Sequence, residues 1–364
     1  MRDKTTPFAR SAAAAAQDRN EIKARFEKAH SEQKDAWREL QGSPPDRLYH
    51  YTTVDGMRGI VGAQCIWASD VRFMNDSSEL SYARDLIEEE IQAVLKEATA
   101  QRFIGPLADR ERLTTGVFEN VVPFIACFCE VDDLLSQWHG YGQSDDGSVS
   151  LGLDLRRYSD DSGSHDATLR RVIYDETLQR NLVRESANQW LRVARSLADE
   201  IPADEIPTHG PLRFYALSAL QTAMLEYYLC FKHPTFAEER EWRLIGLVDL
   251  RSHLRRMGEI EKNKYAKRMD YPAIDPTPSS ESSGSEMPIH ILFRRSAYGL
   301  TPYIELPLRD SDGDYANRLE ILGVTQGPRA HAELALESLR MYLQSAGYLS
   351  HPSDVRATSV PLRR

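Results

Sequence analysis

The side chains of Leu48-Tyr49-His50-Tyr51-Thr52 are in turn apolar, aromatic, imidazole, aromatic and hydroxyl-bearing, and this alternation predicts a short β-strand. Successive side chains of a strand point to opposite faces, so His50 lies on one face and Tyr49 and Tyr51 lie on the other. A polar, titratable ring packs poorly in a core, whereas it can hydrogen-bond a ligand rich in hydroxyl groups. We therefore take His50 as a candidate binding residue, with Tyr51 and Thr52 beside it.

The composition is that of an ordinary globular protein. Hydrophobic residues make up 41% of the 364 residues, which is enough for one large core or two smaller ones. The formal net charge of −10 argues against a general electrostatic attraction to nucleic acid. Charged residues closely flank the alanine run at 12–16, so this run predicts neither a signal peptide nor a membrane span. The four cysteines predict reduced core thiols in the cytoplasm, and Cys127 and Cys129 lack the second pair that a zinc site needs.

The pattern along the chain predicts an α+β fold with a short-stranded mixed or antiparallel sheet and flanking helices, rather than a doubly wound nucleotide-binding fold. Residues 1–45 form a polar helical arm, and residues 46–364 form a single domain with a flexible Pro- and Ser-rich insertion near 257–287. Further helices are expected at 54–61, 79–99, 177–200, 211–232 and 330–345. Strands are expected at 48–52, 65–69, 121–130, 148–155, 169–174, 241–247, 289–293, 303–307, 319–324 and 355–361.

A second informative segment, Glu239-Arg240-Glu241-Trp242-Arg243, enters a strand from a carboxylate-rich turn. Alternation places Glu239, Glu241 and Arg243 on one face, which projects into solvent or a cleft if Trp242 faces the core. Two carboxylates beside a guanidinium can orient a ribose or stabilise developing positive charge. The same residues can also form a solvated edge with an ion pair between Arg243 and Glu241, which adds little stability. Composition alone favours this structural interpretation.

Aromatic residues supply candidates for contact with a flat ligand ring. Trp138 and Tyr141 lie in the glycine-containing segment 136–142, which predicts either an aromatic wall or a loop that folds back onto the core. Tyr82 lies one helical turn after Glu79, so these two residues share a face of the helix expected at 79–99. The glycine-rich phosphate loops, the zinc-protease His-Glu-x-x-His pattern and the Gly-x-Ser-x-Gly pattern are missing from the sequence.

Several short motifs follow one another along the chain in a characteristic order and spacing. These motifs are Leu48-Tyr49-His50-Tyr51-Thr52, Trp67-Ala68-Ser69, Phe73-Met74-Asn75-Asp76 with Glu79, Ala126-Cys127-Phe128-Cys129-Glu130, Gln137-Trp138 with Tyr141, residues 147–154, Glu239-Arg240-Glu241-Trp242-Arg243, Gly327-Pro328 and Ser359-Val360-Pro361-Leu362-Arg363. With these motifs, the chain resembles a bacterial family known as domain of unknown function 2971, over about residues 47–363. The family itself implies no activity.

The chain is more distantly similar to ADP-ribosyltransferases, in which a first core strand bears a His, a later region bears an aromatic residue and a late strand bears a Glu. The resemblance implies that NAD is the substrate and that His50 hydrogen-bonds one of its riboses. It implies that Glu241 binds the nicotinamide ribose and stabilises the charge left by departing nicotinamide, while Glu239 orients the acceptor. Three aromatic residues compete for stacking on nicotinamide: Tyr82, Trp67 and Trp138.

These observations predict a cytoplasmic protein with an ADP-ribosyltransferase-like core that hydrolyses NAD or transfers ADP-ribose to a protein or nucleic-acid acceptor, as a toxin or anti-phage defence effector. One alternative is a metal-dependent nuclease that uses His50, His139 and the carboxylates near Glu239. The other is a non-catalytic sensor that binds a nucleotide-like ligand and signals through the N-terminal helix. This helix is also the expected contact of a homo-oligomer. Neither a membrane nor a bound metal is expected.

Overall fold

The computed structural model describes residues 7–74, 77–97, 121–141, 147–159, 167–200, 210–249, 290–296, 299–308, 320–348 and 354–361. The insertion expected near 257–287 lies outside these ranges. The chain divides into two compact units, and each is assembled from three separate stretches of sequence. Unit 1 comprises Met1–Pro45, Asp76–Val117 and Arg170–Trp242, and unit 2 comprises Asp46–Asn75, Phe118–Leu169 and Arg243–Arg364.

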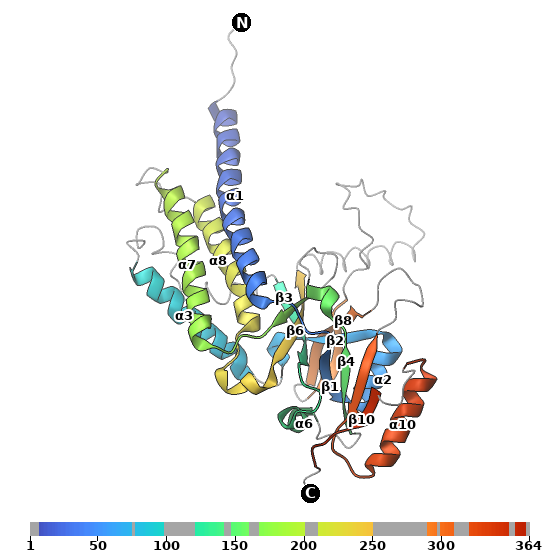
Figure 1. Cartoon of the computed structure of the whole chain (residues 1–364). Helices are drawn as coiled ribbons and strands as arrows, with labels where there is room; N and C mark the ends of the chain where they lie inside the picture. The colour runs from blue at the N-terminus through green and yellow to red at the C-terminus, as the bar shows by residue number, and fades with distance from the viewer. Residues whose placement is uncertain are drawn as a thin grey trace, which may run out of the picture. The chain divides into compact units, whose positions relative to one another are not determined.

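Unit 1 is built from long helices (Figure 1). They are α1 (Pro7–Gln41), α3 (Ser77–Glu97), α7 (Glu176–Ala198) and α8 (Gly210–Cys230). Both α1 and α3 pack against α7 and α8. The sparse apolar face of α1 is what is buried there, since Ile22, Phe26 and Trp37 are all nearly inaccessible to solvent. Although α1 is mostly polar, it is therefore an integral helix of unit 1.

The sheet of unit 2 is mixed and mostly antiparallel, with the strand order β10-β9-β4-β1-β3-β2-β8-β7. Only the pairing of β10 with β9 is parallel along this path. Two further strands, β5 (Ala167–Arg171) and β6 (Glu241–Asp249), complete the ten-stranded sheet, in which β6 pairs with β3 and β5. The bounds of the others are β1 Leu48–Thr53, β2 Cys65–Asp70, β3 Val121–Cys129, β4 Ser148–Leu153, β7 Leu292–Ser296, β8 Gly299–Pro307, β9 Ile321–Gln326 and β10 Val355–Ala357.

Short helices cover parts of this sheet. The helix α2 (Val54–Ala63) packs on β1, β2 and β4, α6 (Leu135–Tyr141) packs on β1, and α10 (Ala332–Ser345) packs beside β10. Three 3₁₀ turns complete the described secondary structure: η1 (Val71–Phe73) and η3 (Arg156–Ser159) in unit 2, and η5 (Pro234–Glu239) in unit 1.

The predicted α+β class, with a mixed sheet and flanking helices, is confirmed. Two boundaries differ from the expectation for a clear reason. The helix α2 continues past residue 61 to Ala63, and its C-cap is Gln64, which adopts the left-handed conformation (φ 56°) and donates its N–H to the Ile60 carbonyl. The strand expected at 355–361 stops at Ala357, because the backbone then turns and the N–H of Ser359 donates to Asp133.

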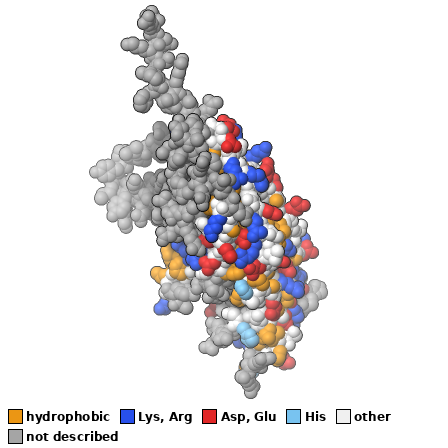
Figure 2. Space-filling model, turned by 90° about the vertical axis from the view of Figure 1, so that its left-hand side faces the viewer, with side chains coloured by type: hydrophobic (Ala, Val, Ile, Leu, Met, Phe, Trp, Pro, Cys, Tyr) orange, Lys and Arg blue, Asp and Glu red, His pale blue; other side chains and the backbone are white. Residues whose placement is uncertain are grey.

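The surface mixes charges of both signs. Figure 2 shows acidic and basic side chains interspersed on one face, so the acidic excess is not gathered there into a patch of a single sign. Every helix within the described ranges is too short or too polar to cross a bilayer.

Candidate functional site

Lys232 is the centre of the candidate site in unit 1. Its backbone N–H donates to the Ile173 carbonyl at 3.2 Å, directly after the isolated bridge between Phe231 and Ile173. Its side chain is buried, and Nζ lies 2.6 Å from Glu239 Oε2 and 3.0 Å from Glu241 Oε2. The two carboxylates predicted from the sequence therefore converge on a cation that the sequence did not single out.

The turn at Arg240 is what brings these carboxylates together. Glu239 is the last residue of η5, Arg240 has a left-handed φ of 42°, and β6 then begins at Glu241. Glu239 thus belongs to a helical turn, so strand alternation does not align it with Glu241 as the sequence suggested. Glu241 is also only 5% exposed, so of the two expected surroundings, solvent or a cleft, solvent is excluded and the cleft stays a prediction. The two carboxylates do converge, but the backbone turn at Arg240 brings them together, and strand alternation does not.

Burial makes these three charges depend on one another. Lys232 and Glu241 are almost fully enclosed, while the Glu239 side chain keeps 21% of its surface exposed. Two neighbouring carboxylates repel each other unless a cation lies close to both. Removing one member of a buried ion pair leaves an uncompensated charge, at a cost of about 3–5 kcal/mol. The Lys232 ammonium is therefore what makes the close approach of Glu239 and Glu241 tolerable.

Tyr174 contacts the backbone of the same turn. Its hydroxyl oxygen accepts a hydrogen bond from the Glu241 N–H at 3.0 Å. Burial, followed by the charge of Glu241, raises the pKa of the Tyr174 hydroxyl well above its ordinary value. This hydroxyl is consequently protonated at neutral pH.

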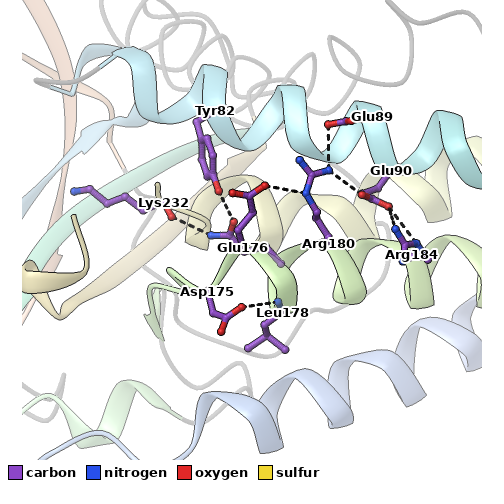
Figure 3. Close-up of polar contacts among 10 residues, drawn as sticks. Tyr82, Glu89, Glu90, Asp175, Glu176, Leu178, Arg180, Arg184 and Lys232 are labelled. Atoms are coloured by element: carbon purple, nitrogen blue, oxygen red, sulfur yellow. Dashed lines mark hydrogen bonds and ion pairs between the residues drawn. The ribbon is translucent and has the colours of Figure 1, made fainter. Parts of the chain in front are cut away.

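A buried amide links Lys232 to Tyr82 (Figure 3). Gln179 on α7 donates from Nε2 to the carbonyls of Ile173 at 2.6 Å and Lys232 at 3.0 Å. Its Oε1 accepts from the Tyr82 hydroxyl at 2.7 Å. Burial, followed by the charge of Glu176, raises the pKa of Tyr82 to about 12, so this hydroxyl stays a donor at neutral pH. Tyr82 and Gln179 thus fix the backbone from which the Lys232 side chain extends.

Ion pairs between α3 and α7 hold the helix that carries this amide (Figure 3). Glu90 on α3 is buried and accepts from Arg180 at 2.8 Å and from Arg184 at 2.7 Å. Arg180 also binds Glu176, one turn earlier on α7, at 3.0 Å. The first turn of α7 is capped by Asp175, whose carboxylate accepts from the Leu178 N–H. A carboxylate held by two guanidinium groups restrains the rotation of α7 relative to α3.

His50 lies in unit 2, on the face of β1 opposite Tyr51. Its Nδ1 is 2.9 Å from the carbonyl oxygen of Cys127, and because a carbonyl only accepts, Nδ1 carries the proton and Nε2 is an acceptor. Burial lowers the pKa of His50, and the smaller opposing effect comes from this hydrogen bond. The imidazole is therefore neutral at pH 7. The ring of Phe128 packs against it, with centroids 5.5 Å apart.

Tyr51 and Trp138 occupy the core of unit 2. The Tyr51 hydroxyl donates to the Val131 carbonyl at 2.7 Å and accepts from the Leu134 N–H at 2.9 Å. Trp138 meets Tyr51 edge-on at 4.7 Å between centroids, and its indole N–H donates to Asp133 at 2.8 Å. Each ring is only 3% exposed. Contact of either residue with a ligand stays a prediction.

The remaining predicted binding residues lie elsewhere. Trp67 on β2 is 46% exposed, with its ring 4.6 Å from that of Tyr303. Tyr82 is half-buried and meets the His233 ring edge-on at 5.1 Å. Thr52 is half-buried on β1, and the side chain of Tyr141 lies outside the described part of the structure. Trp67 is thus the most exposed of the three rings proposed to stack on nicotinamide.

Metal-ligating side chains do not gather in the described ranges: nowhere in them do three or more His, Cys, Asp or Glu residues come together as a metal site requires. Cys127 is half-buried and Cys129 is buried, and both lie on β3.

The comparisons with known proteins identify one region. Residues 137–244 match the model of a family described as protein of unknown function (DUF2971). This region is shorter than the resemblance expected over residues 47–363, but it includes Lys232, Glu239 and Glu241. Neither curated proteins nor solved structures gave a match. None of these comparisons supports the more distant resemblance to ADP-ribosyltransferases.

Proposed function

We propose that this protein cleaves NAD at the bond between nicotinamide and ribose and passes the ADP-ribosyl group to a macromolecule or to water. The observation that carries the proposal is the convergence of Glu239 and Glu241 on Lys232. A pair of fixed carboxylates matches what the reaction needs, because positive charge builds up on the ribose and the acceptor must lose a proton.

The proposed reaction breaks the bond between C1′ of the ribose and the nicotinamide nitrogen. The electron pair of this bond leaves with nicotinamide, which departs as a neutral molecule, and positive charge stays on C1′ and the ring oxygen. Glu241 stabilises this charge and accepts a hydrogen bond from a ribose hydroxyl. The acceptor then bonds to C1′ and gives its proton to Glu239. With water as the acceptor, the products are nicotinamide, ADP-ribose and a proton.

Lys232 is a positioning residue in this scheme. It holds the two carboxylates side by side through contacts of 2.6 and 3.0 Å. In a Lys232→Met variant the carboxylates would share a proton to relieve their repulsion. We expect the acidic limb of the pH–rate profile to move to higher pH in this variant, whereas a merely structural role would lower the rate without moving the limb.

The direct test measures nicotinamide release from NAD by the purified full-length chain. Glu241→Gln should lower the rate by about a hundredfold or more, because one charge-stabilising group is lost. The matched control is Glu238→Gln, which alters an exposed carboxylate in the same turn and should leave the rate unchanged. The absence of release by the wild-type chain, or a normal rate in Glu241→Gln, would sink the proposal.

Tyr82 lies in the same unit as the two carboxylates, so its predicted stacking on nicotinamide can be tested through KM. Tyr82→Leu should raise KM more than kcat changes, while Tyr82→Phe, which keeps a ring, should not. A normal KM in Tyr82→Leu would rule out this contact.

A non-catalytic ligand sensor is the second candidate. It is favoured by the burial of Glu241 and by the ion pairs that Lys232 makes with both carboxylates, since this is also how a purely structural cluster is built. A sensor would show a rise in melting temperature with NAD, without release of nicotinamide.

A further inference from the structure

One face of the sheet in unit 2 presents an exposed tryptophan. The strand β8 pairs with β2 on one side and with β7 on the other. Trp67 of β2 pairs with Glu305 of β8. Two positions along, Ser69 pairs with Tyr303, and Arg294 of β7 pairs with the residue two positions before Tyr303. Paired residues, and residues two positions apart in one strand, point to the same side of a sheet. We call the five residues on this side the Trp67 face: Trp67, Ser69, Arg294, Tyr303 and Glu305.

The opposite face of these strands belongs to the core. Its residues on β2 and β8 include Ile66, Ala68, Ile304 and Leu306, each at most 1% exposed. Trp67, by contrast, is 46% exposed, although it is the largest side chain of its strand. The alternation of β2 therefore directs an indole ring away from the core, where its apolar surface is available to a ligand.

Two contacts fix the orientation of the Trp67 ring. The ring of Tyr303 packs against it, with centroids 4.6 Å apart and planes inclined by 36°. The indole Nε1–H donates to Glu305 Oε1 at 3.3 Å. Because a second ring and a carboxylate already hold the indole, a ligand that stacks on it loses little free energy to the ordering of this side chain.

A charge of each sign lies beside the two rings. Arg294 donates from Nη2 to the Ser69 hydroxyl at 3.0 Å. Since β8 lies between β7 and β2, the Arg294 side chain reaches across β8 to make this contact. Burial raises the pKa of the Tyr303 hydroxyl, the charge of Glu305 adds to the rise, and the charge of Arg294 opposes it. Tyr303 therefore lies within electrostatic reach of both charges.

This arrangement favours a neutral ligand over a charged one. A cation on the indole would be attracted by the ring and by Glu305 but repelled by Arg294, and an anion would be attracted by Arg294 but repelled by Glu305. A ring that carries several hydroxyl groups can use both charges, because a carboxylate accepts hydrogen bonds from hydroxyls and a guanidinium donates to their oxygens.

The size and shape of the Trp67 face match a six-membered sugar ring. The C–H groups on one side of a pyranose form an apolar surface, which complements the flat apolar surface of an indole. Trp67 and Ser69, the residue that Arg294 binds, lie two positions apart on β2, which is about 7 Å along the strand. A single pyranose with its hydroxyl groups spans this length.

We propose that the Trp67 face binds a neutral pyranose sugar. The sugar ring stacks on the indole of Trp67, Glu305 accepts hydrogen bonds from sugar hydroxyls, and Arg294 donates to sugar oxygens. The site lies entirely in unit 2 and uses neither Lys232 nor the two carboxylates of unit 1, so it is independent of the proposed cleavage of NAD.

Tryptophan fluorescence reports on this site specifically. The chain has five tryptophans, and the four besides Trp67 are at most 6% exposed: Trp37, Trp138, Trp190 and Trp242. A soluble quencher such as acrylamide therefore acts mainly on Trp67. The test titrates the full-length chain with the methyl glycosides of glucose, galactose and mannose and with N-acetylglucosamine. At least one of these sugars, at millimolar concentration, should protect the fluorescence from quenching.

Variants locate the binding site on the sheet. Glu305→Ala should weaken sugar binding by about tenfold or more, since a charged hydrogen-bond acceptor is lost, and Arg294→Ala should do the same for a charged donor. Both residues are exposed, so both variants should fold as the wild type does, which circular dichroism checks. Trp67→Ala, measured by calorimetry, should abolish binding. The matched control is Phe293→Ala, which removes a ring that is 61% exposed on the other face of β7 and should leave binding unchanged.

Several results would overturn the proposal. They are the absence of protection by every sugar of the panel, sugar binding that survives in Trp67→Ala, and tighter binding of choline or of ribose 5-phosphate, which would mark a site for a cation or an anion. Protection that rises with the concentration of the protein alone would show that a second copy of the chain covers Trp67, and it would overturn the proposal as well.

Discussion

At the scale of single residues, Lys232 stabilises the candidate site of unit 1 through its ion pairs with two carboxylates. We expect Lys232→Met to lower the free energy of unfolding by about 3 kcal/mol or more, because Glu241 would lose a buried cationic partner. Urea unfolding monitored by circular dichroism measures the change. Lys23→Met is the matched control, since Lys23 pairs with Glu27 on the exposed side of α1 and should contribute less than about 0.5 kcal/mol. A loss below 1 kcal/mol in Lys232→Met would contradict the importance of this ion pair.

His50 gives the folded protein a dependence on pH. Burial holds the pKa of His50 below its ordinary value near 6.5, so the folded state favours the neutral ring. Its contribution to stability is therefore complete above about pH 6.5 and is lost as the pH falls toward the folded-state pKa, by up to about 1.4 kcal/mol per pH unit. Unfolding in urea at pH 7.5 and pH 5.5 should show a smaller difference for His50→Gln than for the wild type.

Two other histidines serve as references for this measurement. Burial also lowers the pKa of His30 on α1, so a residual pH dependence should survive in His50→Gln. His139 is exposed, and His139→Gln should keep the full wild-type difference. An unchanged difference in His50→Gln would contradict the lowered pKa of His50 in the folded state.

At the scale of secondary-structure elements, η5 is joined to β6 by a single residue in the left-handed conformation, Arg240. Arg240 has a φ of 42°, which costs an L-residue about 1–2 kcal/mol and costs glycine almost nothing. Arg240→Gly should therefore be more stable than Arg240→Ala by about 1 kcal/mol in urea unfolding. The two variants lose the same guanidinium, so the comparison isolates the backbone. Equal stabilities would indicate that Arg240 does not adopt this conformation.

Most elements follow from local sequence patterns. The strand β1 was expected from the alternation of residues 48–52, and α3 from the apolar stripe of residues 79–99, and both are found within three residues of those limits. The position of Glu239 could not be predicted in this way. A run of alternating residues suggested a strand, whereas the 3₁₀ turn that starts at Pro234 and is capped by His233 takes Glu239 out of it.

At the scale of the whole molecule, neither unit is a continuous stretch of chain. The helix α1 contributes to unit 1 by burying Trp37, whose ring meets Tyr227 edge-on at 5.1 Å. Trp37→Ala should lower the free energy of unfolding by about 3–5 kcal/mol, because it leaves a large cavity between α1 and α8. Asp35→Ala changes an exposed ion pair on the same helix and should have almost no effect. A small loss in Trp37→Ala would contradict the burial of this ring between α1 and α8.

The sequence by itself determined the fold class, the order of the strands and of the helices other than α6, and the carboxylates of the segment 239–241. These features depend on hydrophobic periodicity and turn residues, which act over short distances along the chain. Only the tertiary structure decided what those carboxylates contact. Lys232, Gln179 and Tyr82 lie far apart in sequence and meet only in the folded unit 1. Such contacts arise from packing between distant segments, for which a single sequence contains no local signal.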